Sequence, residues 1–223
     1  MPYSSVIPIG SVCQVSDQLK HNEIDYVHTP WEWAVTPLQA LIDAIDDDGQ
    51  SFGLEMERYD RNYTVKCLRY GHLHHHDFTR DIADDNRVAP LSIEEITQCR
   101  SKFLHKMSRF RDACRTDGKK LFIRLGGEFR EPIAWPYIGD PEPLAFSRIN
   151  HLVRTLERYC RSSDFVLAHV RYPSLVSVAA DEQLDQKVKL LTLPDSVGRT
   201  SVGDFAPWAS LLSSLDLKTK ASE

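Results

Sequence analysis

The chain has 223 residues, of which 42% are hydrophobic and 26% charged, and these ordinary globular values favour one folded domain with a sizeable core. The net charge of −5 and the pI near 6.0 give no surplus of positive charge, so we expect no nucleic acid partner. No window approaches the roughly 18 apolar residues that span a bilayer, so we expect no membrane partner. Residues 1–10 lack the pattern of a signal peptide. Five cysteines without paired spacing favour reduced thiols, so we expect a cytoplasmic protein.

Apolar runs and helical stripes alternate along the first part of the chain. An apolar run predicts a buried strand, and an apolar stripe with a spacing of three and four predicts a helix. The elements expected here, in chain order, are a strand at residues 6–9, a helix at 12–20 capped by Ser11, a helix that begins at Thr36-Pro37, irregular structure or a small hairpin at 49–61, and one strand at 63–76.

A capping box opens the second part, because Ser92 is followed three residues later by Glu95. Behind it, a long apolar stripe predicts an amphipathic helix. The elements expected here are that helix at residues 93–114, a buried strand at 121–125, a helix that begins at Asp140-Pro141, and strands at 165–170 and 187–193. Residues 213–223 are polar and are expected to fray.

Strands that are separated by helices of a dozen or more residues favour parallel pairing, with helices against both faces of the sheet. We therefore predict an α/β fold over residues 1–212, a single three-layer catalytic-type domain with a mostly parallel sheet, followed by a polar tail at 213–223. The alternative is a papain-like α+β arrangement.

Cys13 is the first residue that could carry chemistry. It follows a strand, Gly10 and Ser11, and it opens a helix, where free N–H groups and the partial positive charge of the helix end favour a thiolate and could bind an oxyanion. Its other interpretation is a small buried hydrophobic side chain, because free cysteine is among the most buried residue types.

The second feature is a run of histidines from His72 to His76, in which only Leu73 interrupts the imidazoles. On one strand, His72, His74 and His76 would share a face. One of them could be the base for Cys13, or all three could hold Zn²⁺ with a water in the fourth position. A third interpretation is a polar strand end with exposed histidines.

Trp33 lies in an aromatic corner after Pro30, which we interpret as a packed loop or a substrate wall. Arg124 ends a buried strand, at the edge of a parallel sheet where ligands bind. It could clamp an anion or form a structural ion pair. The neighbouring glycines match no nucleotide-binding motif.

Four segments of the chain together resemble a bacterial family of unknown function described as papain-like cysteine peptidases. Family members open with a Gly-Ser-x-Cys-Gln segment, followed by Pro-Phe-Asp-Trp, His-Asp-Phe and Leu-Phe-Ile-Arg elements. The matching segments here are Gly10-Ser11-Val12-Cys13-Gln14, Pro30-Trp31-Glu32-Trp33, His76-Asp77-Phe78 and Leu121-Phe122-Ile123-Arg124. The match covers about the first 130 residues, and Trp31 stands where the family has Phe. It implies a catalytic pair of Cys13 and His76, and it implies no substrate.

We therefore expect a cysteine-dependent hydrolase or acyltransferase that acts on an amide, ester or thioester of a small-molecule, acyl or peptide substrate. Cys13 is the expected nucleophile and His76 the base, with Asp77, Glu32 or an acid later in the chain as the third member. Ser11, Gln14, Trp33 and Arg124 are the expected oxyanion and substrate-binding residues, and no metal or cofactor is expected. The alternatives are a metal-dependent enzyme that uses His72, His74 and His76, and a non-catalytic binding domain.

Overall fold

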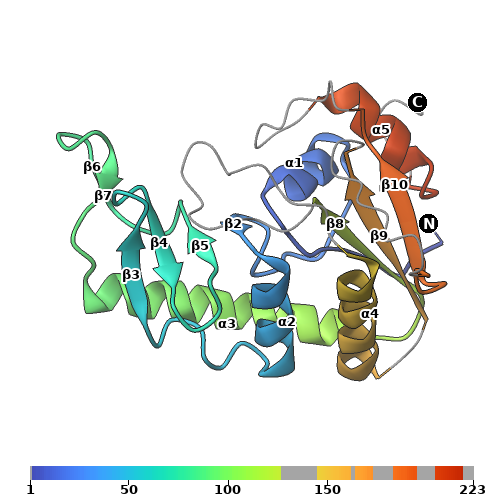
Figure 1. Ribbon diagram of the computed structural model, residues 1–223, viewed down its shortest axis with the longest axis horizontal. Helices are drawn as coiled ribbons and strands as arrows, with labels where there is room; N and C mark the ends of the chain where they lie inside the picture. The colour runs from blue at the N-terminus through green and yellow to red at the C-terminus, as the bar shows by residue number, and fades with distance from the viewer. Residues whose placement is uncertain (1, 127–144, 162–163, 173–182, 195–203, 218–223) are drawn as a thin grey trace.

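The computed structural model describes residues 2–126, 145–161, 164–172, 183–194 and 204–217 (Figure 1). Four parallel strands form its main sheet in the order β1-β8-β9-β10. Their bounds are β1 (Ser5–Pro8), β8 (Lys120–Leu125), β9 (Phe165–Arg171) and β10 (Val188–Thr192). The mixed α/β class with a parallel sheet is confirmed, whereas the three-layer order stays a prediction.

Helix α4 (Phe146–Cys160) connects β8 to β9, as the pairing of two parallel strands requires. Its buried face matches the predicted stripe and contains Ile149, Leu152, Val153 and Leu156. The predicted start of this helix at Asp140 lies outside the described residues.

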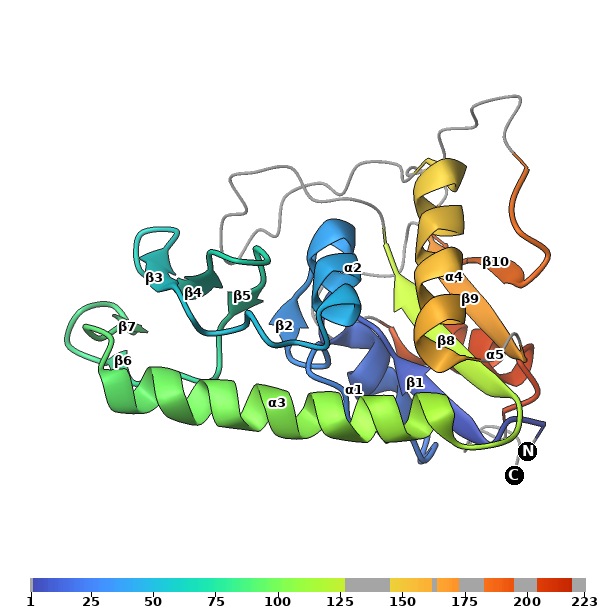
Figure 2. The same cartoon turned by 90° about the horizontal axis from the view of Figure 1, so that it is seen from below.

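Helix α3 (Ile93–Arg115) is the longest described element and begins where the sequence predicts. The capping box is confirmed, because the Ser92 hydroxyl accepts from the Glu95 N–H at 3.2 Å and the Glu95 carboxylate accepts from the Ser92 N–H at 3.2 Å. Figure 2 shows α3 running along the molecule beside both the main sheet and the smaller strands. None of the helices that the structure describes combines the length and apolarity of a bilayer crossing.

Side chains of the main sheet alternate between two apolar clusters, because successive residues of a strand point to opposite faces. Ile7, Phe122 and Leu167 pack in one cluster, together with residues of α2 (Leu38–Asp46), α3 and α4. Their strand neighbours, Val6, Leu121 and Ala168, pack in the other, together with residues of α1 (Gln14–His21) and α5 (Phe205–Ser213).

Helix α5 has no counterpart among the predicted elements, although its Trp208 is completely buried. Leu215 and Leu217 lie within the predicted polar tail, yet both are buried in the same cluster as Trp208. The packed part of the chain therefore continues past residue 213.

A smaller antiparallel sheet has the strand order β2-β5-β4-β3. Its strands are β2 (Ala34–Val35), β3 (Met56–Tyr59), β4 (Thr64–Cys67) and β5 (Leu73–His74), and a further hairpin joins β6 (Arg80–Asp81) to β7 (Arg87–Val88). The prediction of one strand over residues 63–76 is wrong. Gly71, with a φ of 89°, allows a left-handed turn that closes when its N–H donates to the Cys67 carbonyl at 2.7 Å.

Candidate active site

Cys13 lies between β1 and α1, at the N-cap position of the helix. The predicted cap, Ser11, lies two residues earlier, so α1 begins at Gln14 and the free N–H groups of its first turn follow the thiol directly. The Cys13 side chain is half-buried, whereas the other four cysteines are buried. Cys13 is therefore the most accessible of the five thiols.

Ser11 holds this turn in place through its hydroxyl, which donates to the Leu125 carbonyl at 2.6 Å. Its own carbonyl accepts from the Thr36 N–H at 2.7 Å. Gly10 has a φ of 81°, and a Cβ atom there would lie 3.1 Å from the Thr36 side chain. Ser11, which we expected at the oxyanion or substrate, is instead buried and engaged with the backbone.

Arg124 supports the same turn from β8. Its side chain is completely buried, and its two terminal nitrogens donate to the carbonyls of Ile9 at 2.9 Å and Thr36 at 3.0 Å. These contacts join the end of β1 to the segment before α2. The guanidinium thus has a structural use in place of the predicted anion clamp.

The small sheet brings the histidine segment to the Cys13 turn. Val35 of β2 pairs with Leu73 of β5, and Val12, the neighbour of Cys13, packs against both side chains. His76 follows β5 by two residues. The predicted nucleophile and base therefore come from neighbouring segments of the fold, although they are far apart in the sequence.

Asp17 joins these two groups electrostatically. Its N–H donates to the Cys13 carbonyl at 3.0 Å, which places the two residues one helical turn apart. Burial raises the pKa of Asp17, and the nearby cationic groups of Lys20 and His76 oppose that shift. The Trp33 ring lies edge-on to the His76 ring, with 6.3 Å between centroids. Sequence reasoning missed Asp17, although its four-residue spacing from Cys13 was a usable signal.

The pKa of Cys13 is raised to about 11, first by burial and then by the charge of Asp17, while a backbone hydrogen bond lowers it by less. The expectation of a lowered thiol pKa at the helix N-terminus is wrong, because burial and Asp17 together outweigh the backbone hydrogen bond. The thiol is protonated at neutral pH, so nucleophilic attack by Cys13 requires a base.

The acids that the sequence predicts as the third member have other partners. A carboxylate oxygen of Asp77 lies 3.2 Å from Nδ1 of His74, which places Asp77 on a different imidazole from His76. Glu32 is buried, with its two oxygens bound to His28 at 2.9 Å and Lys106 at 2.5 Å. Asp17 thus replaces both as the acid whose charge reaches His76.

The three histidines that would share a strand face do not all converge, because β5 contains only His74 and ends before His76. The ring of His76 contacts His75, at 4.9 Å between centroids, and Trp33. Within the described part of the chain, the ligand atoms close enough to hold one ion belong to His74, Asp77 and Cys99. The alternative site of His72, His74 and His76 is therefore not assembled.

Gln14 is buried beside Cys13, and its Oε1 accepts from the Tyr172 hydroxyl at 3.2 Å. Its Nε2 has no hydrogen-bond partner among the described residues. An amide donor that is oriented by Tyr172, on the residue that follows Cys13, has the chemistry needed to bind an oxyanion.

The comparisons with known proteins found no match. No family model matches it. No curated protein and no solved structure is significantly similar to it either. The resemblance to papain-like cysteine peptidases therefore depends on the four sequence segments alone and stays an interpretation.

We expect Asp17→Asn to speed the alkylation of Cys13 by iodoacetamide at pH 8. Loss of this carboxylate removes one of the causes that raise the thiol pKa, so a larger fraction of Cys13 becomes thiolate. An increase of about 3- to 10-fold would correspond to a shift of half a pKa unit to one unit. The rate is measured by mass spectrometry of the Cys13 peptide.

Asp25→Asn is the matched control for this experiment, because Asp25 is exposed and does not affect the Cys13 pKa. An unchanged rate in Asp17→Asn would contradict the electrostatic coupling. Modification of a buried cysteine before Cys13 in the unaltered protein would contradict the order of accessibility.

Proposed function

We propose that the chain is a cysteine-dependent hydrolase or acyltransferase that acts through Cys13 and His76 on an amide, ester or thioester. The observation that carries the proposal is a half-buried thiol at the start of α1 whose neighbour Asp17 interacts with both Cys13 and His76. A nucleophile, a base and an acid from two distant segments are the components that acyl transfer needs.

The raised pKa of Cys13 favours general-base activation over a preformed thiolate. His76 takes the thiol proton as sulfur attacks the carbonyl carbon, which gives a tetrahedral intermediate. Asp17 stabilises the imidazolium that forms and disfavours an isolated thiolate. It therefore couples the proton transfer to His76 with the attack by sulfur. The N–H groups of the first turn of α1 and the Gln14 amide bind the negative oxygen.

Collapse of the intermediate breaks the bond to the leaving group, which takes the proton from His76 and leaves an acyl thioester on Cys13. Water or another acceptor then attacks the thioester, again with His76 as the base, and the carbon–sulfur bond breaks as His76 returns the proton to Cys13. Trp33, edge-on to His76, supplies an apolar wall for the acyl group. All five cysteines are free thiols, which agrees with a cytoplasmic enzyme.

Trapping of the acyl-enzyme tests the proposal. We expect incubation with p-nitrophenyl acetate, or with a small acyl thioester, to add one acyl group to the Cys13 peptide, with an initial burst of released leaving group. Intact-mass and peptide analysis measure the adduct, and Cys13→Ser is the control.

Acylation spread over surface lysines, with no preference for Cys13, would contradict the proposal. A stable adduct on Cys13 that never turns over would identify a binding domain with an accessible thiol, the non-catalytic alternative.

A further inference from the structure

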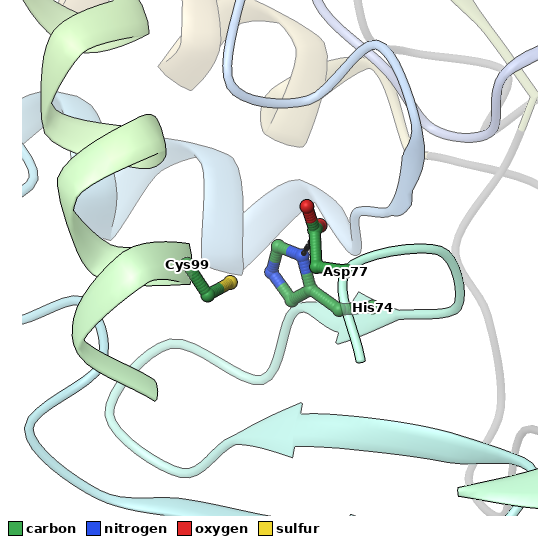
Figure 3. Close-up of side chains that lie close together, drawn as sticks. All are labelled: His74, Asp77 and Cys99. Carbon is green, nitrogen blue, oxygen red and sulfur yellow. Dashed lines mark hydrogen bonds and ion pairs between the residues drawn. The ribbon is translucent and has the colours of Figure 1, made fainter. Parts of the chain in front are cut away.

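A cluster of side chains that could bind a metal ion lies between β5 and α3, outside the Cys13 site. It centres on His74 and Cys99, both nearly fully buried. Figure 3 shows the Cys99 thiol pointing from α3 toward the His74 ring, with Asp77 on the other side of the imidazole. One ligand atom from each of His74, Asp77 and Cys99 lies within 4.8 Å of the others.

Unpartnered nitrogens in this cluster point to a ligand. Asp77 contacts Nδ1 of His74, whereas the buried Nε2 of His74 has no hydrogen-bond partner among the described residues. His72 is completely buried, and neither of its ring nitrogens has such a partner. A buried polar atom without a partner is destabilising, and a bound cation would remove that penalty from an imidazole nitrogen.

Further donors border the same space. The His72 and His74 ring centroids lie 6.4 Å apart, and the Cys67 N–H donates to the His72 carbonyl at 2.9 Å. The buried thiol of Cys67 is close enough to that of Cys99 to interact with it electrostatically. A second thiol, of Cys67, and a second imidazole, of His72, therefore border the group of His74, Asp77 and Cys99.

We propose that this cluster is a structural zinc site, with Nε2 of His74 and Sγ of Cys99 as its central ligands. Cys67 and His72 are not among the ligand atoms that lie within 4.8 Å of one another, and their approach on zinc binding would give two sulfurs and two nitrogens, a donor set that tetrahedral Zn²⁺ takes in proteins. Asp77 is a positioning residue, because a carboxylate on the far nitrogen of a ligating imidazole fixes the ring orientation. His74 and Cys99 are buried, so the ion joins the hairpin to α3 and has no part in the Cys13 chemistry.

This proposal replaces the sequence-based expectation of no metal. Histidine spacing alone supplied no second pair of ligands, and the structure supplies Cys67 and Cys99 from other segments. The proposal is independent of the proposed function, because Cys13→Ala should bind zinc as the unaltered chain does.

The first test uses the metal alone. Protein purified without a His-tag and stripped with a chelator is titrated with Zn²⁺ and, separately, with Co²⁺. We expect one ion per chain, a thiolate-to-cobalt absorption band, and a rise in melting temperature of about 5–10 °C with zinc. No stoichiometric binding of either ion at micromolar concentration would overturn the proposal.

The second test identifies the ligands. We expect Cys99→Ser and His74→Ala to weaken zinc binding by more than about 100-fold, and Asp77→Asn by about 10- to 100-fold. Cys114→Ser, at another buried thiol of α3, and His105→Ala, at an exposed histidine of α3, are the matched controls and should bind normally. Unchanged affinity in Cys99→Ser or His74→Ala would overturn the assignment.

If the variants fail to fold, a measurement on the unaltered chain still tests the proposed ligands. Zinc should slow the alkylation of Cys99 and Cys67 in mild denaturant relative to Cys114, and a chelator should remove that protection. Equal alkylation rates with and without zinc would contradict the proposed ligands.

Discussion

Cys13→Ala and His76→Ala should each abolish turnover of an acyl substrate, with a loss in kcat of about 10³-fold or more. The double variant should be little worse than either single variant. A thiol with a pKa of about 11 is inert at neutral pH without a base, and the imidazole has no proton to accept without the thiol. Both residues therefore act in the same step, the attack of sulfur on the acyl carbon. Steady-state kinetics of the three variants measure this non-additivity.

His105→Ala, on the exposed face of α3, is the control histidine and should retain full activity. Two outcomes would contradict the pair. Full activity in Cys13→Ala would exclude cysteine catalysis. A folded His74→Ala that is as inactive as His76→Ala would favour the other imidazole as the base, and His72→Ala should likewise cost much less than His76→Ala.

Arg124→Met should lower the free energy of unfolding by about 2–4 kcal/mol. Methionine fills a similar volume, but it leaves the Ile9 and Thr36 carbonyls without the two donors that the guanidinium supplies at 2.9 and 3.0 Å. Loss of hydrogen bonds at a completely buried position leaves acceptors that water does not reach. Urea denaturation measures the change.

Arg154→Met on α4 is the matched control, because Arg154 is exposed and should cost less than about 0.5 kcal/mol. Because Arg124 also holds the turn that carries Cys13, its substitution should alter the alkylation rate of Cys13 in the folded protein. A fully stable Arg124→Met with an unaltered rate would show that the turn holds its shape without these bonds.

The main sheet was predictable because its strands are continuous apolar runs, such as residues 121–125, and its helices have clear caps or stripes. The small sheet was not predictable. Strands β2 and β5 contain two residues each, so their pairing is set by packing against the Cys13 turn, and a two-residue strand has no periodicity to detect.

The candidate site was partly predictable for a related reason. The order of the motifs along the chain indicated Cys13 and His76. It did not show whether a neighbouring polar side chain hydrogen-bonds to the backbone or contacts the substrate. Ser11 and Arg124 serve the backbone. The raised pKa of Cys13 depends on burial, which is set by segments far away in the sequence.

The length of α3 affects how the molecule unfolds locally. Its 23 residues make a rod of roughly 34 Å, since an α-helix rises about 1.5 Å per residue. One apolar cluster contains residues along the whole rod, from Cys99 and Phe103 to Phe110 and Cys114, and Figure 2 shows the rod running beside both sheets. Fraying of the hairpins alone would expose the part of that cluster around Cys99 and Phe103, so native-state hydrogen exchange should detect both sheets opening together as one cooperative unit.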